Sequence, residues 1–262
     1  MKALAFDIST NNTGWSYIDL SKTNDGYRID SFEYGNIQPS MTMDACQKIY
    51  FFGNRMKELI EKFNPDEIAF EEAILIMGHG FTTARALSRY NGVGVYFAYQ
   101  LTGKEIFLYE PSHWKKQLGL DGFCQKAEVQ LEVSKRLKLI TPEQHTKFLQ
   151  MFQEEFAKIS VSDEIKQVEA EMKQKEIIFK ESLVGIDKGE AKLKLAEHRV
   201  ESKKELVAFK NDMKKVKKKR AAEYAKALNK IGTTLYTITG MNPDVADSFG
   251  VNFCMLQEFG FK

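Results

Sequence analysis

The sequence predicts an α/β domain with a mixed sheet, and a long helical hairpin inserted into that domain. Over residues 1–109, apolar runs of strand and helix length follow one another as three strands, a helix, a strand, a second helix and a further strand. Between Pro142 and Pro243 the chain contains no proline and is rich in Glu, Lys, Gln and Ala, which is typical of long helices. We therefore expect a layered domain over residues 1–140 and 231–262, and an antiparallel coiled-coil hairpin over residues 141–230.

The stretch ALAFDISTNNTGWSY, residues 3–17, is the centre of the predicted domain. Its apolar run is typical of a central strand, which would hold Asp7 rigidly at the strand's end. Strands over 14–20 and 27–34, joined by a turn-rich segment, would complete an antiparallel meander. Asp7 is therefore a candidate site residue, although a turn-capping role, which nearby Ser, Thr and Asn residues could also fill, explains it equally well.

The rest of this domain follows from the spacing of apolar residues. Helical spacing and short apolar runs predict two helices and two more strands, over residues 43–63, 68–70, 82–101 and 106–109. The strand over 68–70 leads into Glu71 and Glu72, so it delivers carboxylates to a defined end. The segment 74–81 that follows is apolar and contains glycine, and we expect it to be a mobile loop.

The segment 112–138 turns polar and basic. It contains Lys115 and Lys116, followed by Lys126 at the start of a further helix. An ordinary solvated connection explains this composition, and so does a loop and helix whose lysines contact phosphate groups. These three lysines are therefore candidate nucleic-acid contacts.

Two helical arms are predicted for the hairpin. Thr141-Pro142-Glu143 is a good helix start, and the glycine-containing segment 183–189 is the break between the arms. Apolar residues recur at three- and four-residue spacing along both arms, which is typical of an antiparallel coiled coil. The outgoing stripe comprises Phe148, Phe152, Phe156, Ile159, Ile165, Val168, Met172 and Phe179, interrupted by Lys175, and the return stripe comprises Leu193, Ala196, Val200, Leu206, Val207, Phe209, Met213 and Val216.

The return arm carries a surplus of positive charge. Residues 192–220 contain twelve Lys and Arg against four acids, whereas residues 153–190 contain six against ten. Complementary charge between the arms explains part of this difference. The run over 214–220 exceeds that need, and we interpret it as a phosphate-binding edge in preference to a solvated face. Its basic residues are Lys214, Lys215, Lys217, Lys218, Lys219 and Arg220.

The last predicted helix begins at Asn242-Pro243 and carries Asp244 and Asp247 on one face of its first turn. Acids in a first turn also interact favourably with the helix dipole, so either one alone has a structural explanation. Two of them on an otherwise apolar helix favour a site. Together with Asp7 and Glu71 they would form a carboxylate cluster whose members repel one another without cations. Such oxygen ligands favour Mg²⁺ or Mn²⁺, and two ions of this kind clamp the attacking and leaving oxygens of a phosphodiester displacement.

Composition limits the remaining classes of protein. The chain of 262 residues is 43% hydrophobic and 28% charged, with a net charge of +2, so it can bury a core and is not disordered overall. Its three cysteines are widely spaced and form no C-x-x-C pair, which argues against a disulfide frame or a zinc site. The sequence has neither a signal-peptide pattern nor an apolar run of transmembrane length, so we expect a soluble intracellular protein.

Three motifs together resemble the RuvC family of Holliday junction resolvases, within the RNase H-like superfamily. They are Phe6-Asp7-Ile8-Ser9 with Gly14-Trp15, Ala69-Phe70-Glu71-Glu72, and Asp244-Val245-Ala246-Asp247-Ser248, and the likeness covers residues 1–133 and 232–262. The resemblance implies an RNase H-like fold and a metal-dependent endonuclease that cuts four-way or other branched DNA. By position, it makes Asp7, Glu71, Asp244 and Asp247 the metal ligands. Glu71 is preferred to Glu72 because the family's acid directly follows the apolar pair.

The same resemblance implies further properties. It places Lys126 near the scissile phosphate, two Mg²⁺ or Mn²⁺ ions in each site, and the protein in the cytoplasm of a bacterial or phage-infected cell, at the nucleoid. It also implies a homodimer, for which the helix over 82–101 is the candidate interface. Two alternatives remain open: an RNase H-like nuclease that acts on RNA or another nucleic acid, and a non-catalytic junction-binding protein. An actin-like ATPase is disfavoured because no glycine-rich phosphate loop follows Pro142.

Overall fold

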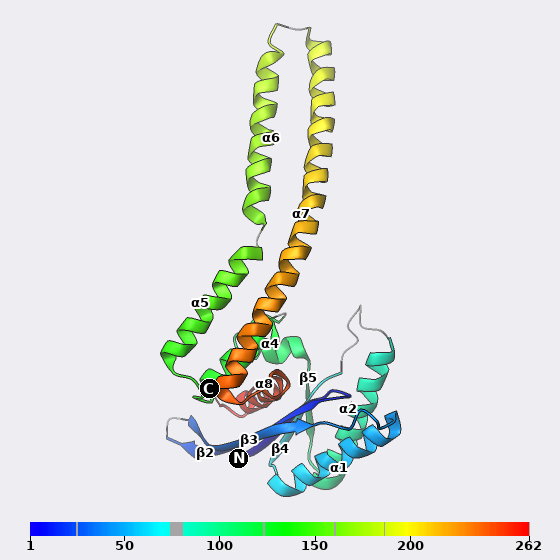
Figure 1. The fold of residues 1–262 in the computed structure, drawn as a ribbon, viewed down its shortest axis with the longest axis vertical. Helices are drawn as coiled ribbons and strands as arrows, with labels where there is room; N and C mark the ends of the chain where they lie inside the picture. Colours follow the sequence, from blue (N-terminus) through cyan, green and yellow to red (C-terminus); the bar gives the residue numbers. More distant parts are fainter. Residues whose placement is uncertain (25, 74–80, 123, 160, 186, 262) are drawn as a thin grey trace. The chain divides into compact units, whose positions relative to one another are not determined.

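The computed structural model describes residues 1–262 except 25, 74–80, 123, 160, 186 and 262 (Figure 1). The chain divides into two compact units: unit 1 comprises Met1–His145 and Ile231–Lys262, and unit 2 comprises Thr146–Lys230. The segment expected to be a mobile loop, 74–81, lies outside the described residues except for Phe81, where α2 (Phe81–Thr102) begins.

The described part of unit 1 is built on β1 (Lys2–Asp7), β2 (Thr13–Thr23), β3 (Gly26–Ile37), β4 (Glu67–Glu71) and β5 (Ile106–Tyr109). These strands form one sheet with the order β3-β2-β1-β4-β5. β1 pairs antiparallel with β2, and β2 with β3, which confirms the predicted meander. β1 pairs parallel with β4, and β4 with β5, so the sheet is mixed, as predicted. β1 is therefore the central strand, with hydrogen-bonded neighbours on both sides.

The helices of this unit include α1 (Ala45–Phe63), α2, α3 (Pro111–Gln117), α4 (Lys126–Arg136) and α8 (Pro243–Glu258). α1 begins two residues later than predicted, because Asp44 acts as its N-cap and accepts a hydrogen bond from the backbone N–H of Gln47. The polar connection predicted over 112–138 contains two helices, and Pro111 occupies the favoured first position of α3. Among the described residues, no helix combines the length and apolar character needed to cross a membrane.

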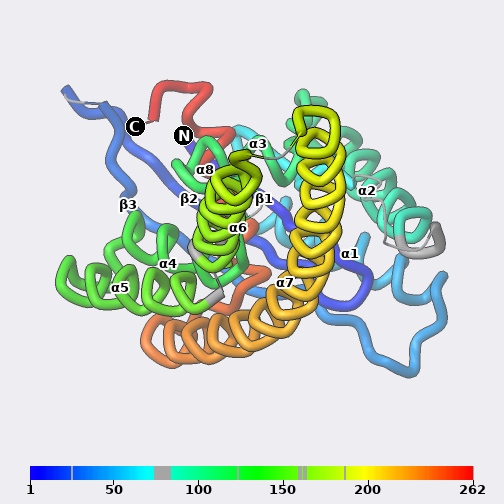
Figure 2. Tube along the Cα trace, turned by 90° about the horizontal axis from the view of Figure 1, so that it is seen from above, coloured from blue at the N-terminus to red at the C-terminus, as the bar shows by residue number. Residues whose placement is uncertain are grey.

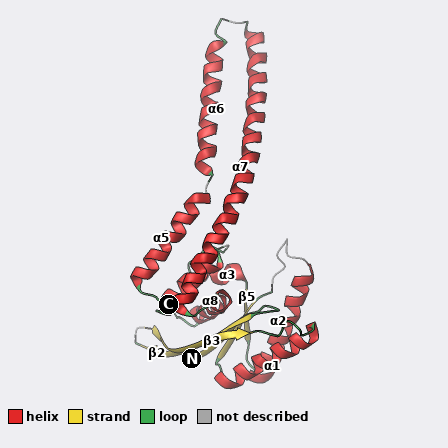
Figure 3. Cartoon of the chain, in the orientation of Figure 1, coloured by secondary structure: helices red, strands yellow, loops and turns green. Residues whose placement is uncertain are grey.

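Alternate side chains of β1 belong to two different hydrophobic cores. Leu4 and Phe6 pack with Phe52 and other residues of α1 and α2, whereas Ala3 and Ala5 lie in the core that contains α3, α4 and α8. These four side chains of β1, two on each face of the sheet, are fully buried. Figure 3 shows the strands between these helical layers, and α1 and α2 lie side by side in both Figure 1 and Figure 2. The end of β1 is therefore fixed by packing on both faces of the sheet.

Unit 2 is formed by parts of α5 (Pro142–Ile159) and α7 (Lys188–Thr239) together with α6 (Ser162–Ser182). The predicted outgoing arm is therefore divided, since α5 ends before α6 begins. The return helix is longer than predicted, because α7 continues through Gly232 to Thr239.

Ion pairs define how α6 and α7 are aligned within unit 2. Each pair joins an acid of α6 to a base of α7, and the residue numbers rise along α6 as they fall along α7. The two helices therefore run antiparallel, as predicted. The pairs and their N–O distances are Glu164–Arg220 at 2.9 Å, Glu169–Lys210 at 2.7 Å and Glu176–Arg199 at 2.9 Å.

The contact face of α7 differs in part from the predicted apolar stripe. Leu206, Phe209, Met213 and Val216 are half-buried, as predicted. Nearer the turn the prediction is wrong, because the predicted apolar residues are exposed and other residues, two of them polar, take the half-buried positions. An apolar pattern cannot locate a contact face that polar side chains fill. The exposed residues are Leu193, Ala196 and Val200, with Val207 further along the helix, and the half-buried ones nearer the turn are Ala191, Leu195, His198 and Ser202.

The outgoing arm differs from its predicted stripe in two places. Phe156 is 60% exposed, although its ring still meets the edge of Tyr224 on α7. On α6, Lys175 is exposed, and its neighbour Glu176 takes the half-buried position where it pairs with Arg199. Lys175 therefore does not interrupt the face of α6 that contacts α7, because Glu176 lies on that face instead and forms an ion pair with α7.

Candidate functional site

Asp7 lies at the end of the central strand, where it pairs in register with Gly14 on β2. Four apolar residues, Ala3 to Phe6, precede it and are fully buried. Asp7 itself is only 7% exposed. A carboxylate so buried is strongly destabilising unless a charge or hydrogen bonds compensate it, so a turn-capping role alone does not account for it.

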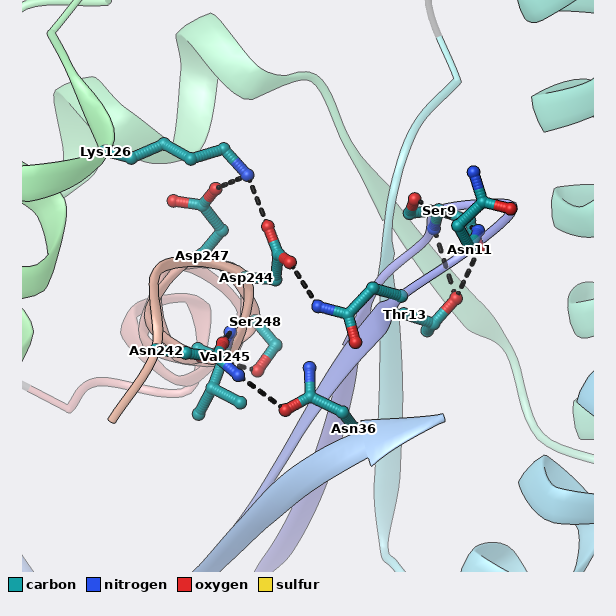
Figure 4. Close-up of polar contacts among 11 residues, drawn as sticks. Ser9, Asn11, Thr13, Asn36, Lys126, Asn242, Asp244, Val245, Asp247 and Ser248 are labelled. Atoms are coloured by element: carbon teal, nitrogen blue, oxygen red, sulfur yellow. Dashed lines mark hydrogen bonds and ion pairs between the residues drawn. The ribbon is translucent and has the colours of Figure 1, made fainter. Parts of the chain in front are cut away.

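The first turn of α8 brings two more acids to the same place. The side chain of Asn242 caps this helix by accepting a hydrogen bond from the backbone N–H of Val245 at 2.9 Å. Asp244 and Asp247 then lie on one face of the turn, as Figure 4 shows. Gly14 permits the close approach of β2, because a Cβ there would lie 2.1 Å from the backbone oxygen of Asp244.

These acids form one cluster. One carboxylate oxygen from each of Asp7, Asp244 and Asp247 lies within 4.8 Å of the others. The Nζ of Lys126, the first residue of α4, lies 2.5 Å from Oδ1 of Asp244 and 3.2 Å from Oδ2 of Asp247 (Figure 4). The amide of Asn12 donates a hydrogen bond to the other oxygen of Asp244. Within the described chain, the buried Oδ1 of Asp247 has no hydrogen-bond partner.

Glu71 is the last residue of β4 and lies outside that group of three. Its Oε2 accepts a hydrogen bond of 2.9 Å from the indole Nε1 of Trp114 on α3. Its backbone oxygen accepts a hydrogen bond of 3.0 Å from the side-chain amide of Asn91 on α2. Its neighbour Glu72 is exposed. The two adjacent acids therefore occupy different environments, and the partly buried one is anchored from two helices.

The carboxylates raise one another's pKa. Burial raises the pKa of Asp7 well above its ordinary value, and the charges of Glu71 and Asp247 raise it further. Burial also raises the pKa of Asp247 to about 6, against the opposing charges of Lys126 and Lys115. For Glu71, burial and the charge of Asp247 raise the pKa to about 7, although the Trp114 hydrogen bond opposes this. The site therefore holds more negative charge than its surroundings stabilise, and it attracts a cation.

Lys126 is the nearest positive charge to this cluster. Desolvation lowers its pKa, but the charges of Asp247 and Asp7 and a hydrogen bond to Asp244 outweigh this effect and raise it above its ordinary value. Lys126 is therefore always charged at neutral pH. A single ammonium group balances part of the charge of four acids.

The other predicted basic residues form no ion pair with these acids within the described chain, although the charge of Lys115 acts on Asp247 and Glu71. The Nζ of Lys115 lies 5.5 Å from the ring centroid of Trp114 and donates to the backbone oxygen of Cys124 at 3.3 Å. Lys116, next to it on α3, is exposed. The run over 214–220 belongs to unit 2, where Lys214, Lys215, Lys217, Lys218 and Lys219 are exposed and Arg220 is half-buried.

Three residues that contact the acids are not predicted from the sequence. Asn12 lies in the turn-rich loop after β1, where its composition indicates only a turn. Trp114 and Asn91 lie on helices and carry no spacing that relates them to Glu71. The one available signal was the unusual place of Trp114, a large aromatic residue inside a polar and basic segment.

A central strand ending in a buried aspartate, with two further aspartates in the first turn of a packed helix, defines a class of α/β proteins with an acidic, cation-attracting site. Residues 4–148 match the family described as Crossover junction endodeoxyribonuclease RuvC, and the chain belongs to this family. The matched residues include Asp7, Glu71 and Lys126. They end before Asp244 and Asp247, whose membership in the site comes from the geometry.

Individual relatives cover about half of this chain. It is 32% identical over 115 residues to the crossover junction endodeoxyribonuclease RuvC of Alkaliphilus metalliredigens, a match covering 44% of this chain and 68% of the relative. It is 30% identical over 140 residues to that of Finegoldia magna, covering 53% and 80%. Among solved structures, Thermus thermophilus RuvC in complex with Holliday junction substrate matches at 21% identity and a TM-score of 0.43, covering 52% of this chain and 78% of that one.

Proposed function

We propose that this protein is a metal-dependent, structure-selective endodeoxyribonuclease that resolves Holliday junctions or other branched DNA. The observation that carries the proposal is the cluster of Asp7, Asp244 and Asp247, whose ligand atoms lie within 4.8 Å of one another. Family membership supports it, since the curated relatives are named crossover junction endodeoxyribonucleases.

The donor set fits Mg²⁺ or Mn²⁺. All candidate ligands are carboxylates, and hard divalent cations prefer oxygen ligands. The buried Oδ1 of Asp247, which has no hydrogen-bond partner among the described residues, is the kind of atom that a cation would satisfy. We assign Asp7, Glu71, Asp244 and Asp247 as the residues that hold two such ions. When bound, these ions would stabilise the charge that develops on the attacking and leaving oxygens of a phosphodiester.

The chain contributes position and charge to this reaction. Asp7 is held by the sheet and Asp244 and Asp247 by the packed start of α8, so the ligand oxygens are in place before substrate binds. Lys126 lies beside the acids. We propose that it contacts the phosphate next to the bond that is cut. Lys115 and Lys116, on the preceding helix, are proposed to bind neighbouring phosphates.

We propose that the protein acts as a homodimer through α2. A four-way junction needs paired incisions, which two sites related by a two-fold axis supply. Tyr96 and Tyr99 on this helix are 61% and 62% exposed, and tyrosine is enriched at protein interfaces. Sedimentation of the chain, free and on junction DNA, tests this point, and a monomer in both states would contradict it.

We propose that residues 141–230 form an antiparallel coiled-coil hairpin inserted into a nuclease domain of residues 1–140 and 231–262. The proposed hairpin binds DNA along a junction branch or on the partner's side. The support is its unbalanced charge. Within the described residues, Lys215 pairs with Asp212 and Arg220 with Glu164, each at 2.9 Å. The remaining exposed lysines of the run have no ion pair there, and a phosphate backbone would offset their repulsion. They are Lys214, Lys217, Lys218 and Lys219.

A cleavage assay on a substrate panel tests the proposed specificity. The panel contains four-way, three-way, flap and single-stranded DNA, together with RNA and RNA–DNA duplexes of matched sequence. We expect the fastest cleavage on the four-way junction. Preferential cleavage of the RNA-containing duplexes would favour the alternative RNase H-like activity. Tight junction binding without cleavage would favour a non-catalytic junction-binding protein.

A further inference from the structure

Among the described residues, the indole N–H of Trp114 makes one hydrogen bond, and its acceptor is a candidate metal ligand. The residue is 0% exposed and belongs to the core formed with α8. Its indole Nε1 donates to Oε2 of Glu71 at 2.9 Å, across 43 residues of sequence. Within the described chain, Oε1 of Glu71 takes part in no hydrogen bond. One oxygen of this carboxylate is therefore held in place, and the other is left available.

The chemistry of the donor suits a carboxylate that binds a cation. An indole N–H is a donor only: it has no lone pair for a metal and carries no charge. It can therefore fix the carboxylate without competing for the cation or repelling it. Lys126 differs in this respect, because its positive charge on Asp244 and Asp247 opposes a bound cation.

The indole fits beside α8 only because residue 250 is glycine. A Cβ at Gly250 would lie 2.5 Å from Cζ3 and 2.6 Å from Cε3 of Trp114. The same helix carries Asp247 one turn earlier. α8 therefore supplies one candidate ligand directly and provides the space for the residue that contacts another.

We infer that Trp114 is a positioning residue, whose N–H holds Oε2 of Glu71 so that Oε1 stays available to a cation bound by the acidic cluster. This inference rests on the proposed metal-dependent function. Packing alone would be satisfied by phenylalanine, which fills much of the same volume but lacks the donor. Conservative replacement by phenylalanine therefore separates positioning from packing.

Mn²⁺ titration of the full-length chain by calorimetry tests the inference. Trp114→Phe is expected to weaken Mn²⁺ binding about tenfold, the lower end of the effect typical of residues that orient a metal ligand. Glu71→Gln is expected to weaken it at least as much, and adding Trp114→Phe to Glu71→Gln is expected to cause no further loss. Glu72→Gln, on the adjacent exposed acid, is the matched control and is expected to bind as the wild type does.

Unchanged Mn²⁺ affinity in Trp114→Phe, or losses that add in the double variant, would overturn the inference while leaving the metal site intact. A wild-type chain that binds no Mn²⁺ would instead overturn the proposed function itself. Gly250→Ala is a second route to the same result, because it displaces the indole without removing a polar group, and its expected effect is also weaker binding.

A measurement without metal tests the role of Trp114 separately from the proposed metal-dependent function. The chain has two tryptophans, so Trp15→Phe leaves Trp114 as the sole indole. In that background and above pH 8, where the Glu71 carboxylate is charged, Glu71→Gln is expected to shift the Trp114 emission, because it replaces a charged acceptor with a neutral one. Glu72→Gln is expected to leave the emission unchanged. Emission that is the same with and without the Glu71 charge would contradict the hydrogen bond, whatever the metal does.

Discussion

The two units of this chain use charged residues in opposite ways. In unit 1, Asp7 and Asp247 are 7% and 5% exposed, and burial raises the pKa of both. In unit 2, Glu169 and Glu176 remain partly exposed, and hydrogen bonds from Lys210 and from Lys180 and Arg199 lower their pKa values. The first arrangement gathers like charges, whereas the second distributes opposite charges along two helices.

This difference separates a site from a scaffold. Exposed ion pairs stabilise a fold only slightly, so those of unit 2 mainly align α6 with α7. Buried carboxylates that are left incompletely compensated destabilise a fold, and they persist where a ligand repays the cost. The acids of unit 1 are therefore explained by what they bind, and those of unit 2 by what they pair with.

The largest expected change in stability comes from Gly14→Ala, which tests how tightly unit 1 is built around its acids. The added methyl group would meet the backbone oxygen of Asp244 at 2.1 Å, so β2 and α8 would have to separate. We expect a loss of about 3 kcal/mol in the free energy of unfolding, measured in urea. Gly92→Ala is the control, since a Cβ there meets no atom within 4 Å and alanine favours the helix. Equal losses in the free energy of unfolding for the two substitutions would contradict the close approach of β2 to α8.

The acids of the two units have pKa shifts of opposite sign, and a pH titration of the stability of metal-free protein tests this difference. The raised pKa values, about 7 for Glu71 and about 6 for Asp247, mean that folded unit 1 binds more protons than its unfolded form between about pH 4 and 7. Its stability is therefore expected to fall as pH rises through this window, and added Mg²⁺ is expected to restore it.

The emission of Trp15 and Trp114, both in unit 1, follows its unfolding. In unit 2 the lowered pKa values give the opposite dependence, with stability lost as pH falls below about 4.5. A loss of helical circular dichroism without a change in the Trp15 and Trp114 emission reports that change, because unit 1 also contains helices. If the stability of metal-free unit 1 stayed constant or rose from pH 5 to 8, the proposed difference between the buried acids of unit 1 and the paired acids of unit 2 would be contradicted.

The smallest expected effect concerns the exposed lysines of unit 2. Four lysines of the run have no ion pair in the described chain, and changing all four to Gln is expected to weaken junction binding roughly tenfold. The slope of the logarithm of the binding constant against the logarithm of the salt concentration is expected to fall in magnitude by up to about 4. The four are Lys214, Lys217, Lys218 and Lys219. Four exposed lysines elsewhere in unit 2 serve as the control: Lys173, Lys175, Lys192 and Lys203. Equal losses in both quadruple variants would mean that net charge alone, and not this run, attracts DNA.

Local patterns predicted the elements that carry the acids. The apolar run before Asp7 and the Asn242-Pro243 start before Asp244 each specify an element and its end, and the structure places both there. Contacts between residues far apart in the sequence have no such local pattern. Trp114 and Glu71 are 43 residues apart, and Asn12 and Asp244 are 232 apart, so only the folded topology brings them together.

The hairpin shows the limit of periodicity. Leu193 and Val200 follow the predicted spacing, but they are 67% and 55% exposed. His198 stacks on Phe179 at a centroid distance of 4.2 Å and occupies the contact face instead. A helical repeat drifts relative to a heptad, so a mixed polar and apolar face cannot be placed from apolar residues alone.

Cleavage of a four-way DNA junction by the wild-type chain and by Asp7→Asn, with and without Mg²⁺, tests the central claim most directly. Asparagine keeps the size of the buried side chain and removes its charge, so the fold and DNA binding are expected to persist. We expect Mg²⁺-dependent cleavage by the wild type and a loss in Asp7→Asn larger than the roughly 100-fold upper limit for residues that only orient a ligand. Cleavage by Asp7→Asn at the wild-type rate would contradict the assignment of this acidic cluster as the active site.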